Sequence, residues 1–176
     1  MLDFVFPNNN EQEFIKIASK LGYTKLCLIY DEKQIPALKE TLKKLQEKTK
    51  IKLLLGVNLG NPPFKKTNAD YAFLASSNNN QPALEQGKFD ILYNAEQFAI
   101  NHILCKLAKK NNISLGFSFS SILKARNKTK LIHNIKTHLM LCKKYNVKPI
   151  FTSFASDPFQ MRSYYDLKSF FSMVTK

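Results

Sequence analysis

The chain has 176 residues, of which 44% are hydrophobic, so it is long enough to form one domain that buries most of its unfolded surface. Lysine and arginine number 27 against 13 aspartates and glutamates, and the resulting net charge of +14 favours a polyanionic partner, with nucleic acid ahead of an anionic membrane surface. No apolar run reaches the length needed to cross a bilayer, which argues against an integral membrane protein.

The first strand and helix can be recognised at the N-terminus. Residues 2–6 form a short apolar run that ends at Pro7 and three asparagines, as expected of a strand followed by a loop. Asn10 and Glu13 match the capping box that starts a helix, and the apolar stripe of this helix ends at Gly22. We therefore expect a helix over about residues 10–21.

The same alternation continues to the C-terminus. Further strands are expected at residues 25–30, 51–57, 71–75, 91–93, 115–119 and 150–152. Further helices are expected at about residues 38–45, 83–86, 96–111 and 131–145. A last helix begins at Ser163, because Ser163 and Asp166 form a second capping-box pattern.

Repeated strand–helix units predict a parallel sheet with helices outside it. About seven strands fit either an open doubly wound sheet or a barrel. The first loop, residues 7–10, has none of the glycines that a dinucleotide site requires, which favours the barrel. The predicted fold class is therefore α/β, a single TIM-barrel-like domain over residues 1–176 with about seven parallel strands and outer helices.

The cysteines and the N-terminus indicate a cellular compartment. Cys27, Cys105 and Cys142 are odd in number, lie in apolar contexts and form no CxxC pair, as expected of reduced, buried thiols. The chain starts directly with a strand-like run, so we expect no signal peptide. A cytoplasmic protein without a membrane partner is the simplest interpretation.

Candidate binding residues follow the strands, because ligands of both architectures meet the loops at the carboxyl ends of the strands. These loops are rich in basic residues and poor in acidic ones. Lysine and arginine there are expected to bind the phosphate backbone of RNA or DNA without reading its bases. The predicted RNA-binding residues are Lys65, Lys66, Lys124, Arg126, Lys128, Lys130 and Arg162.

The candidate residues can also be explained without RNA binding. The cluster at residues 124–130 also fits a mobile solvated loop, and Arg162 also fits a salt bridge to Asp166. Phe64 and Tyr93 fit stacking on bases, although aromatic residues in such sequences more often belong to the core.

Metal-dependent catalysis would require histidines and carboxylates that converge at the strand ends. His102, His133 and His138 fall instead on predicted helices. Zinc binding by His138 with Cys142, or by His102 with Cys105, has a suitable spacing but ranks far below core packing and surface exposure. We therefore expect no catalytic residue, no metal ligand and no cofactor.

The order of several short motifs resembles that of ribonuclease P protein component 3, a family found in archaea with a eukaryotic counterpart. The motifs are the strand that contains Asp3, Leu21-Gly22-Tyr23, Phe89-Asp90-Ile91-Leu92, Asn101-His102-Ile103-Leu104, the segment 107–113, Arg126, the loop 153–158 and the segment 161–167. The ending Arg162-Ser163-x-x-Asp166-Leu167 is the most specific in combination with the others.

The resemblance implies a barrel related to the polymerase-and-histidinol-phosphatase (PHP) metal-dependent phosphoesterases, but without their metal-binding histidines. The first strand reads Phe4-Val5-Phe6-Pro7 where those enzymes have His-x-His. The family implies a non-catalytic protein that binds ribonuclease P RNA and precursor tRNA. It pairs with ribonuclease P protein component 2 and assembles with the other protein subunits, while the RNA removes the 5′ leader.

Two other functions stay open from the sequence. A PHP-like metal-dependent phosphoesterase would use Asp3, Asp90, Asp157 and a histidine. A scaffold that only docks proteins would have no affinity for RNA.

Overall fold

A computed structural model of the chain describes residues 1–60, 64 and 68–175. Within these ranges one parallel seven-stranded sheet follows the order of the sequence. Its strands are β1 (Leu2–Val5), β2 (Lys25–Asp31), β3 (Lys52–Leu59), β4 (Tyr71–Ala75), β5 (Ile91–Tyr93), β6 (Ser114–Ser118) and β7 (Pro149–Thr152). Every ladder between neighbouring strands is parallel, as the repeated strand–helix units predict.

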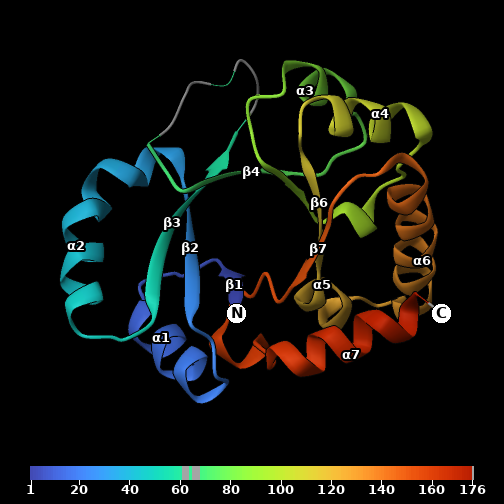
Figure 1. The fold of residues 1–176 in the computed structure, drawn as a ribbon. Helices are drawn as coiled ribbons and strands as arrows, with labels where there is room; N and C mark the ends of the chain where they lie inside the picture. Colours follow the sequence, from blue (N-terminus) through green and yellow to red (C-terminus); the bar gives the residue numbers. More distant parts are fainter. Residues whose placement is uncertain (61–63, 65–67, 176) are drawn as a thin grey trace.

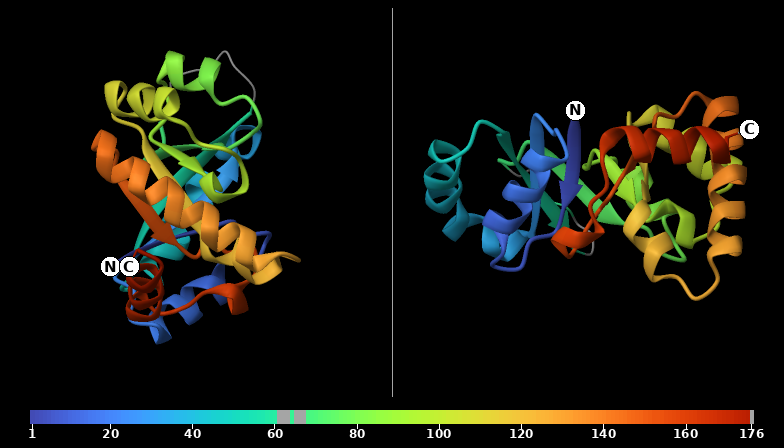
Figure 2. Two further views of the ribbon diagram at one scale, coloured as in Figure 1. Left: turned by 90° about the vertical axis from the view of Figure 1, so that its right-hand side faces the viewer. Right: turned by 90° about the horizontal axis from the view of Figure 1, so that it is seen from below.

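The helices surround this sheet (Figures 1 and 2). The α-helices are α1 (Glu11–Lys20), α2 (Ile35–Glu47), α3 (Gln81–Gln86), α4 (His102–Lys110), α5 (Phe119–Lys124), α6 (Lys128–Tyr145) and α7 (Tyr164–Val174). Among the described residues there are also three short 3₁₀ helices: η1 (Glu32–Gln34), η2 (Ala95–Gln97) and η3 (Pro158–Gln160).

The sheet curves into a nearly closed barrel, whose seam lies between β1 and the segment after β7. An isolated parallel bridge joins Val5 to Ala155, and the Phe6 amide donates to the Ala155 carbonyl at 2.8 Å. The Asp3 carboxylate also crosses the seam, accepting from the Ser153 amide at 2.8 Å and from the Ser153 hydroxyl at 2.6 Å. The predicted TIM-barrel-like fold with seven parallel strands and outer helices is confirmed.

The strands are buried on both faces, which explains their continuous apolar sequences. In β2, Leu26 and Leu28 pack outward among residues of α1 and α2, whereas Cys27 and Ile29 face the barrel interior. The same alternation holds elsewhere in the sheet, because successive side chains of a strand point to opposite faces.

Aromatic rings fill the barrel interior. Phe4 lies with its ring centroid 5.1 Å from that of Phe73 and 5.6 Å from that of Phe154. Two strand glycines provide the necessary room: a Cβ at Gly56 would stand 2.8 Å from Phe73, and one at Gly116 would stand 3.1 Å from Phe154. The interior is therefore a packed core rather than a pore.

Phe154 adopts a left-handed backbone conformation, with φ of 43°. Such a conformation costs about 1–3 kcal/mol for a residue other than glycine. It accompanies a ring that packs inside the barrel, where it stacks on Phe4 and on Tyr93. Packing in the interior thus offsets backbone strain at the point where the chain leaves β7.

The helix starts of α2, α3, α4 and α6 differ from the prediction, and one predicted cap is not formed. The Asn10 side chain does not cap α1 but accepts from the Asn8 amide at 2.8 Å. The helix predicted at 96–111 begins only at His102, where Asn101 accepts from the Leu104 amide at 2.9 Å. The helix predicted at 131–145 begins three residues earlier, and α5 was not predicted at all.

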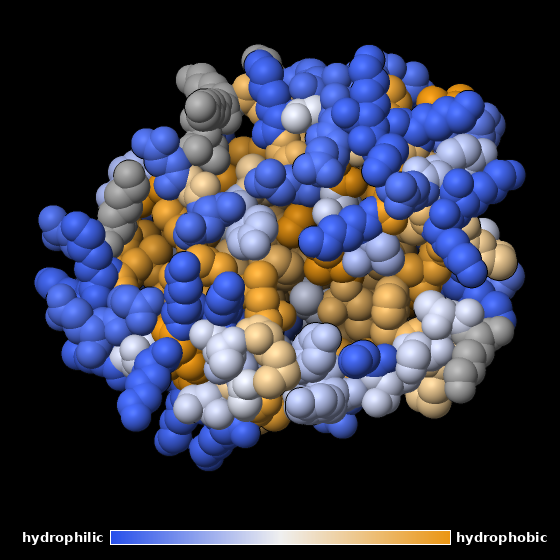
Figure 3. All heavy atoms as spheres, in the orientation of Figure 1, coloured by the Kyte–Doolittle hydropathy of each residue, from blue (hydrophilic) through white to orange (hydrophobic). Residues whose placement is uncertain are grey.

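On one face of the molecule, polar and apolar residues occupy different regions. On the face drawn in Figure 3, hydrophilic residues cover much of the periphery, the lower edge where Figure 1 places α7 is paler, and apolar residues are concentrated where Figure 1 places the strands. Within the described ranges, no helix combines the length and the apolar character needed to traverse a bilayer.

Candidate nucleic-acid interface

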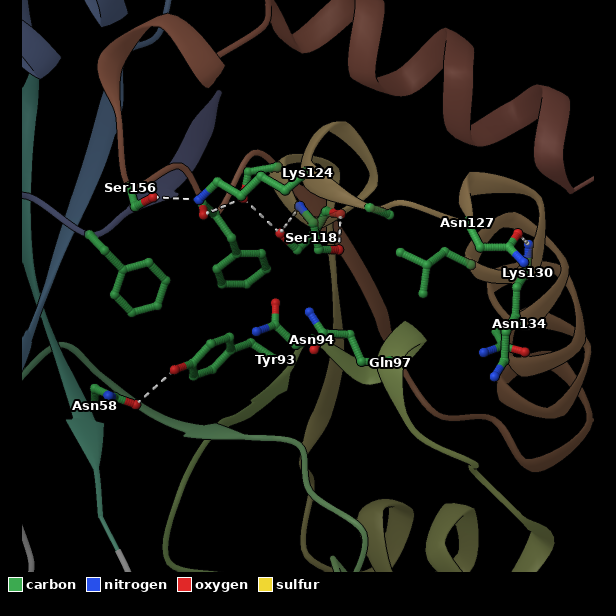
Figure 4. Close-up of a pocket in the computed structure, with 16 residues that line it drawn as sticks. Asn58, Tyr93, Asn94, Gln97, Ser118, Lys124, Asn127, Lys130, Asn134 and Ser156 are labelled. Carbon is green, nitrogen blue, oxygen red and sulfur yellow. Dashed lines mark hydrogen bonds between the residues drawn. The ribbon is translucent and has the colours of Figure 1, made fainter.

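A cavity of about 640 Å³ opens where the carboxyl ends of several strands meet (Figure 4). We call it the mouth cavity. Its walls come from the ends of β3, β5 and β6, from the segments that follow them, from the first turns of α6 and from the segment after β7. The lining residues are Phe6, Asn58, Tyr93, Asn94, Gln97, Ser118, Ser120, Ser121, Lys124, Ala125, Asn127, Lys130, Leu131, Asn134, Phe154 and Ser156.

A buried glutamate fixes one wall of the mouth cavity. Glu96 is fully buried in η2, and its carboxylate accepts from the Ser118 amide at 3.2 Å and from the Ser121 hydroxyl. Burial raises the pKa of Glu96, while the serine hydrogen bonds oppose that rise. The Glu96 carbonyl also accepts from the Asn134 side chain at 2.9 Å, which ties α6 to η2.

The basic segment at residues 124–130 spans the end of α5, a short connection and the start of α6, and is not one long loop. Lys124 ends α5, and its ammonium donates to the Ser156 hydroxyl at 2.6 Å across the mouth cavity. Asn127 caps α6 by accepting from the Lys130 amide at 3.0 Å, so Lys128 and Lys130 lie in the first helical turn. Arg126 is exposed between the two helices.

Arg162 is half-buried and partly engaged by its own chain. Its Nη1 donates to the carbonyls of Phe159 at 2.9 Å and Met161 at 2.7 Å, and its guanidinium lies 5.8 Å from the centre of the Phe119 ring. Asp166, the carboxylate of the alternative interpretation, is bonded instead by the Ser163 hydroxyl at 2.7 Å. A phosphate contact of Arg162 stays a prediction.

The remaining predicted residues fall into two groups. Lys65 and Lys66 lie outside the described residues. Of the two aromatic candidates for base stacking, Phe64 is buried and packs against Phe89, with ring centroids 5.8 Å apart, so it belongs to the core. Tyr93 lines the mouth cavity and donates from its hydroxyl to the Asn58 side chain at 3.1 Å.

Positive charge is concentrated in one part of the chain that extends well beyond the predicted site residues. Residues 97–156 contain eleven lysines and arginines and no aspartate or glutamate. All eleven side chains are exposed. We call them the basic surface: Lys106, Lys109, Lys110, Lys124, Arg126, Lys128, Lys130, Lys136, Lys143, Lys144 and Lys148.

The basic surface extends from the rim of the mouth cavity along the outer sides of two neighbouring helices. α4 packs against α6, so their exposed lysines belong to one side of the barrel. Of the eleven residues of the basic surface, only the four between 124 and 130 were among the predicted RNA-binding residues, because only loops were considered as candidates. The absence of acidic residues over 60 consecutive positions was the signal that could have identified the whole basic surface.

The carboxylates proposed for a phosphoesterase do not converge. Asp3 crosses the barrel seam, and burial raises its pKa to about 6. Asp90 lies at the opposite end of the barrel from the mouth cavity, just before β5, where it accepts from the Ala72 amide at 2.7 Å. Asp157 caps η3 by accepting from the Phe159 amide at 2.8 Å.

The histidines and cysteines are also dispersed. His138 is buried and accepts from the Ile100 amide at 3.3 Å, and burial lowers its pKa to about 4. The three cysteines are free and buried, as predicted, and burial raises the pKa of Cys142 to about 12. Among the described residues, no three histidine, cysteine or acidic side chains are grouped so that they could hold a metal ion.

Comparison with solved structures confirms the barrel. In an archaeal ribonuclease P solved by cryo-electron microscopy with mature tRNA, one chain matches this fold with a TM-score of 0.84 and 19% identity, over 100% of this chain and 83% of that one. Histidinol phosphate phosphatase from Lactococcus lactis, solved with zinc, L-histidinol and phosphate, matches with a TM-score of 0.70 and 10% identity, over 98% and 93% of the two chains. The relation to the PHP barrel is therefore one of fold.

Sequence comparison gives the family. Ribonuclease P protein component 3 of Methanococcus maripaludis strain C7 is 31% identical over 102 residues, which are 54% of this chain and 44% of the relative. The matched region thus spans less than half of that relative's length. The family described as RNase P subunit p30 matches residues 6–174, nearly the whole chain. This chain belongs to the RNase P subunit p30 family.

Proposed function

We propose that this chain is a non-catalytic, RNA-binding protein subunit of the ribonuclease P ribonucleoprotein. The observation that carries the proposal is the basic surface, in which eleven exposed cations occur without one acidic residue over positions 97–156. Such a surface attracts a phosphate backbone by long-range electrostatics and by release of the counterions condensed on the nucleic acid. Family membership and the likeness to a chain of archaeal ribonuclease P support the same assignment.

The composition of the basic surface favours positioning over sequence readout. Ten of its eleven residues are lysines, which act as point charges on phosphates rather than as planar readers of base edges. By screening the repulsion between phosphates, the chain would favour the folded, active form of the RNA. The separation of Asp3, Asp90 and Asp157 supports a protein that leaves the chemistry to the RNA.

The proposal includes the finer assignments of partner and location. The RNA partners are ribonuclease P RNA and precursor tRNA, and the protein partners are ribonuclease P protein component 2 and the other subunits. Residues 1–176 act as a single α/β-barrel domain in the cytoplasm. Together with component 2, the chain lowers the magnesium concentration that the RNA needs for removal of the 5′ leader.

The test compares two variants that lose the same charge from different sides of the barrel. The first replaces Lys106, Arg126, Lys128 and Lys136 of the basic surface by glutamine. The control replaces the exposed Lys43, Lys44, Lys48 and Lys50, in α2 and just after it, by glutamine. Binding to ribonuclease P RNA is measured at several salt concentrations between about 50 and 200 mM.

We expect the first variant to bind RNA more weakly and to show a shallower salt dependence, by about 0.9 in the logarithmic slope for each phosphate that the variant no longer neutralises. The control should bind like the wild type. Equal losses in both variants would mean that net charge alone matters and would remove the case for a specific surface. Cleavage of precursor tRNA by the protein without RNA would overturn the non-catalytic assignment.

A further inference from the structure

The mouth cavity has a chemical character that the basic surface alone does not explain. Its volume of about 640 Å³ falls in the range of small-molecule sites, about 300–1,000 Å³. Two of its lining residues, Lys124 and Lys130, are cationic, and none of those described is acidic. Figure 4 shows these two lysines at different sides of the opening. The cavity is therefore suited to one anionic group at its rim.

Side-chain amides and hydroxyls share the rest of the polar lining. Asn58, Asn94, Gln97, Asn127 and Asn134 all contribute, and a carboxamide can both donate and accept hydrogen bonds. The edges of nucleobases present the same mixture of donors and acceptors. A lining of amides and lysines fits a nucleotide better than it fits a simple anion.

Several of these amide groups are available to a ligand. Within the described part of the chain, the side chains of Asn94 and Gln97 form no hydrogen bond with protein atoms. Asn134 uses its nitrogen to donate to the Glu96 carbonyl, which leaves its oxygen as an acceptor. The backbone of Asn94 is left-handed, with φ of 57°, and this conformation sets the direction of its side chain at the end of β5.

An aromatic wall completes the mouth cavity. Phe6 is half-buried, and its ring centroid lies 5.2 Å from that of Tyr93, which in turn stacks on Phe154 at 5.6 Å. Stacking of a base on an aromatic side chain contributes about 1–3 kcal/mol. The rings thus provide an apolar surface in the same cavity as the amides, and Figure 4 shows Tyr93 beside Asn94 and Gln97.

From this arrangement we propose that the mouth cavity binds a single nucleoside monophosphate unit. One of the two rim lysines, Lys124 or Lys130, pairs with the phosphate, the free amides bond to the base or sugar, and the aromatic wall with Phe6 packs against the base. The inference rests on the proposed function, because a bound RNA is one source of the nucleoside monophosphate. An unpaired nucleotide of a bound RNA and a free mononucleotide present the same chemistry.

The test uses nuclear magnetic resonance titration of the full chain with adenosine monophosphate, adenosine and inorganic phosphate. Saturable binding of the monophosphate, tighter than that of either component, is expected, with shifts at residues that line the cavity. Ala125→Leu fills part of the cavity without changing the charge and should weaken monophosphate binding by at least about fivefold, the equivalent of one stacked base. Ala99→Leu, at an exposed alanine outside the cavity, is the matched control.

Binding of the monophosphate no tighter than phosphate alone, or unaffected by Ala125→Leu, would overturn the inference. If Ala125→Leu does not fold, Gln97→Ala replaces it, because Gln97 is exposed and lines the cavity. Weaker binding of ribonuclease P RNA to the cavity variant identifies an RNA nucleotide as the occupant, and unchanged RNA binding identifies a free mononucleotide.

The result of this experiment is independent of the result of the RNA-binding test in the proposed function. The four basic residues replaced there lie outside the cavity lining, and the cavity variants keep every charge of the basic surface. RNA binding that depends on the basic surface, together with no monophosphate binding, would leave the proposed function intact and reject the nucleotide site.

Discussion

Asp3 shows how one carboxylate holds the barrel seam at an electrostatic cost. It is fully buried and accepts hydrogen bonds from the amide and the hydroxyl of Ser153, across the gap between β1 and the segment after β7. Burial disfavours the charged form more than the hydrogen bonds from Ser153 and Phe4 favour it, so the pKa rises from 3.8 to about 6. The folded chain is therefore more stable relative to the unfolded chain when this carboxyl keeps its proton.

The raised pKa predicts that Asp3 lowers stability as the pH rises from about 4 to 6. In this window the folded chain keeps the proton that the unfolded chain releases, so the free energy of unfolding falls, by up to about 3 kcal/mol for the full shift. Asp3→Asn stays neutral and should not show this loss. Urea unfolding of the wild type and of Asp3→Asn at pH 4.5 and 7 measures the free energy of unfolding of each protein. The difference between the two proteins isolates Asp3, because every other titrating group is common to both. Parallel stability profiles would contradict the assignment.

For single residues, the sequence shows which chemical groups are present, but it does not show which groups they contact in the fold. From the sequence, Arg162 was a candidate for a phosphate contact or for a salt bridge to Asp166. Its bonds to the carbonyls of Phe159 and Met161 depend on how the chain folds back at η3, which no local pattern specifies. The buried Glu96 was likewise missed, because its partners Ser118 and Ser121 are more than 20 residues away.

The two predicted capping boxes have opposite outcomes at the scale of the elements. Ser163 caps α7 as predicted, since its hydroxyl oxygen accepts from the Asp166 amide at 3.2 Å. Asn10 instead accepts from Asn8, because an asparagine in a run of three can satisfy the preceding loop as readily as the helix. A capping motif thus predicts a helix start reliably only when the neighbouring loop offers no competing donor.

Removing the Ser163 cap should destabilise the protein by about 1 kcal/mol, the usual cost of losing a side-chain cap. In Ser163→Ala the Asp166 amide loses its acceptor, and the Asp166 carboxylate loses the hydroxyl that donates to it at 2.7 Å. The free energy of unfolding in urea measures the effect. Ser169→Ala, at an exposed position inside α7, is the matched control and should be neutral or slightly stabilising. Equal effects of the two substitutions would show that the cap contributes nothing.

The start of α6 was missed for a physical reason. Helices usually begin with acidic residues, which interact favourably with the positive end of the helix dipole. Here the first turn carries Lys128 and Lys130, so the sequence looks like a basic loop. The cap by Asn127 and the packing of the helix behind that turn outweigh an unfavourable placement of charge.

For the whole molecule, the order of strands and helices was sufficient to predict the barrel. Seven apolar runs separated by helical segments gave the fold class, because a parallel sheet with outer helices is the architecture that such alternation allows. The mouth cavity could not be predicted in the same way. Its walls come from segments as far apart as Phe6 and Ser156, and their meeting depends on closure of the seam.

The basic surface implies a conflict between binding and stability. A net charge of +14, most of it over residues 97–156, repels itself in the free protein. The side of the barrel that carries α2 differs, since Glu40 and Glu47 accompany the lysines of that helix. Cations on the basic surface are therefore expected to destabilise the free chain while they favour an RNA complex.

The double variant Lys128→Gln/Lys130→Gln tests this conflict. Both lysines lie in the first turn of α6, where each positive charge costs about 0.3–1 kcal/mol at low ionic strength. We expect the variant to be more stable than the wild type by about 1 kcal/mol at about 10 mM salt. This gain should shrink at about 0.1 M salt, because the electrostatic screening length falls from about 30 to about 10 Å. Lys43→Gln/Lys44→Gln near the end of α2 is the control and should give no gain, because lysines near a helix C-terminus are favourable. Urea unfolding at both ionic strengths gives the comparison, and a gain that does not change with salt would refute an electrostatic origin.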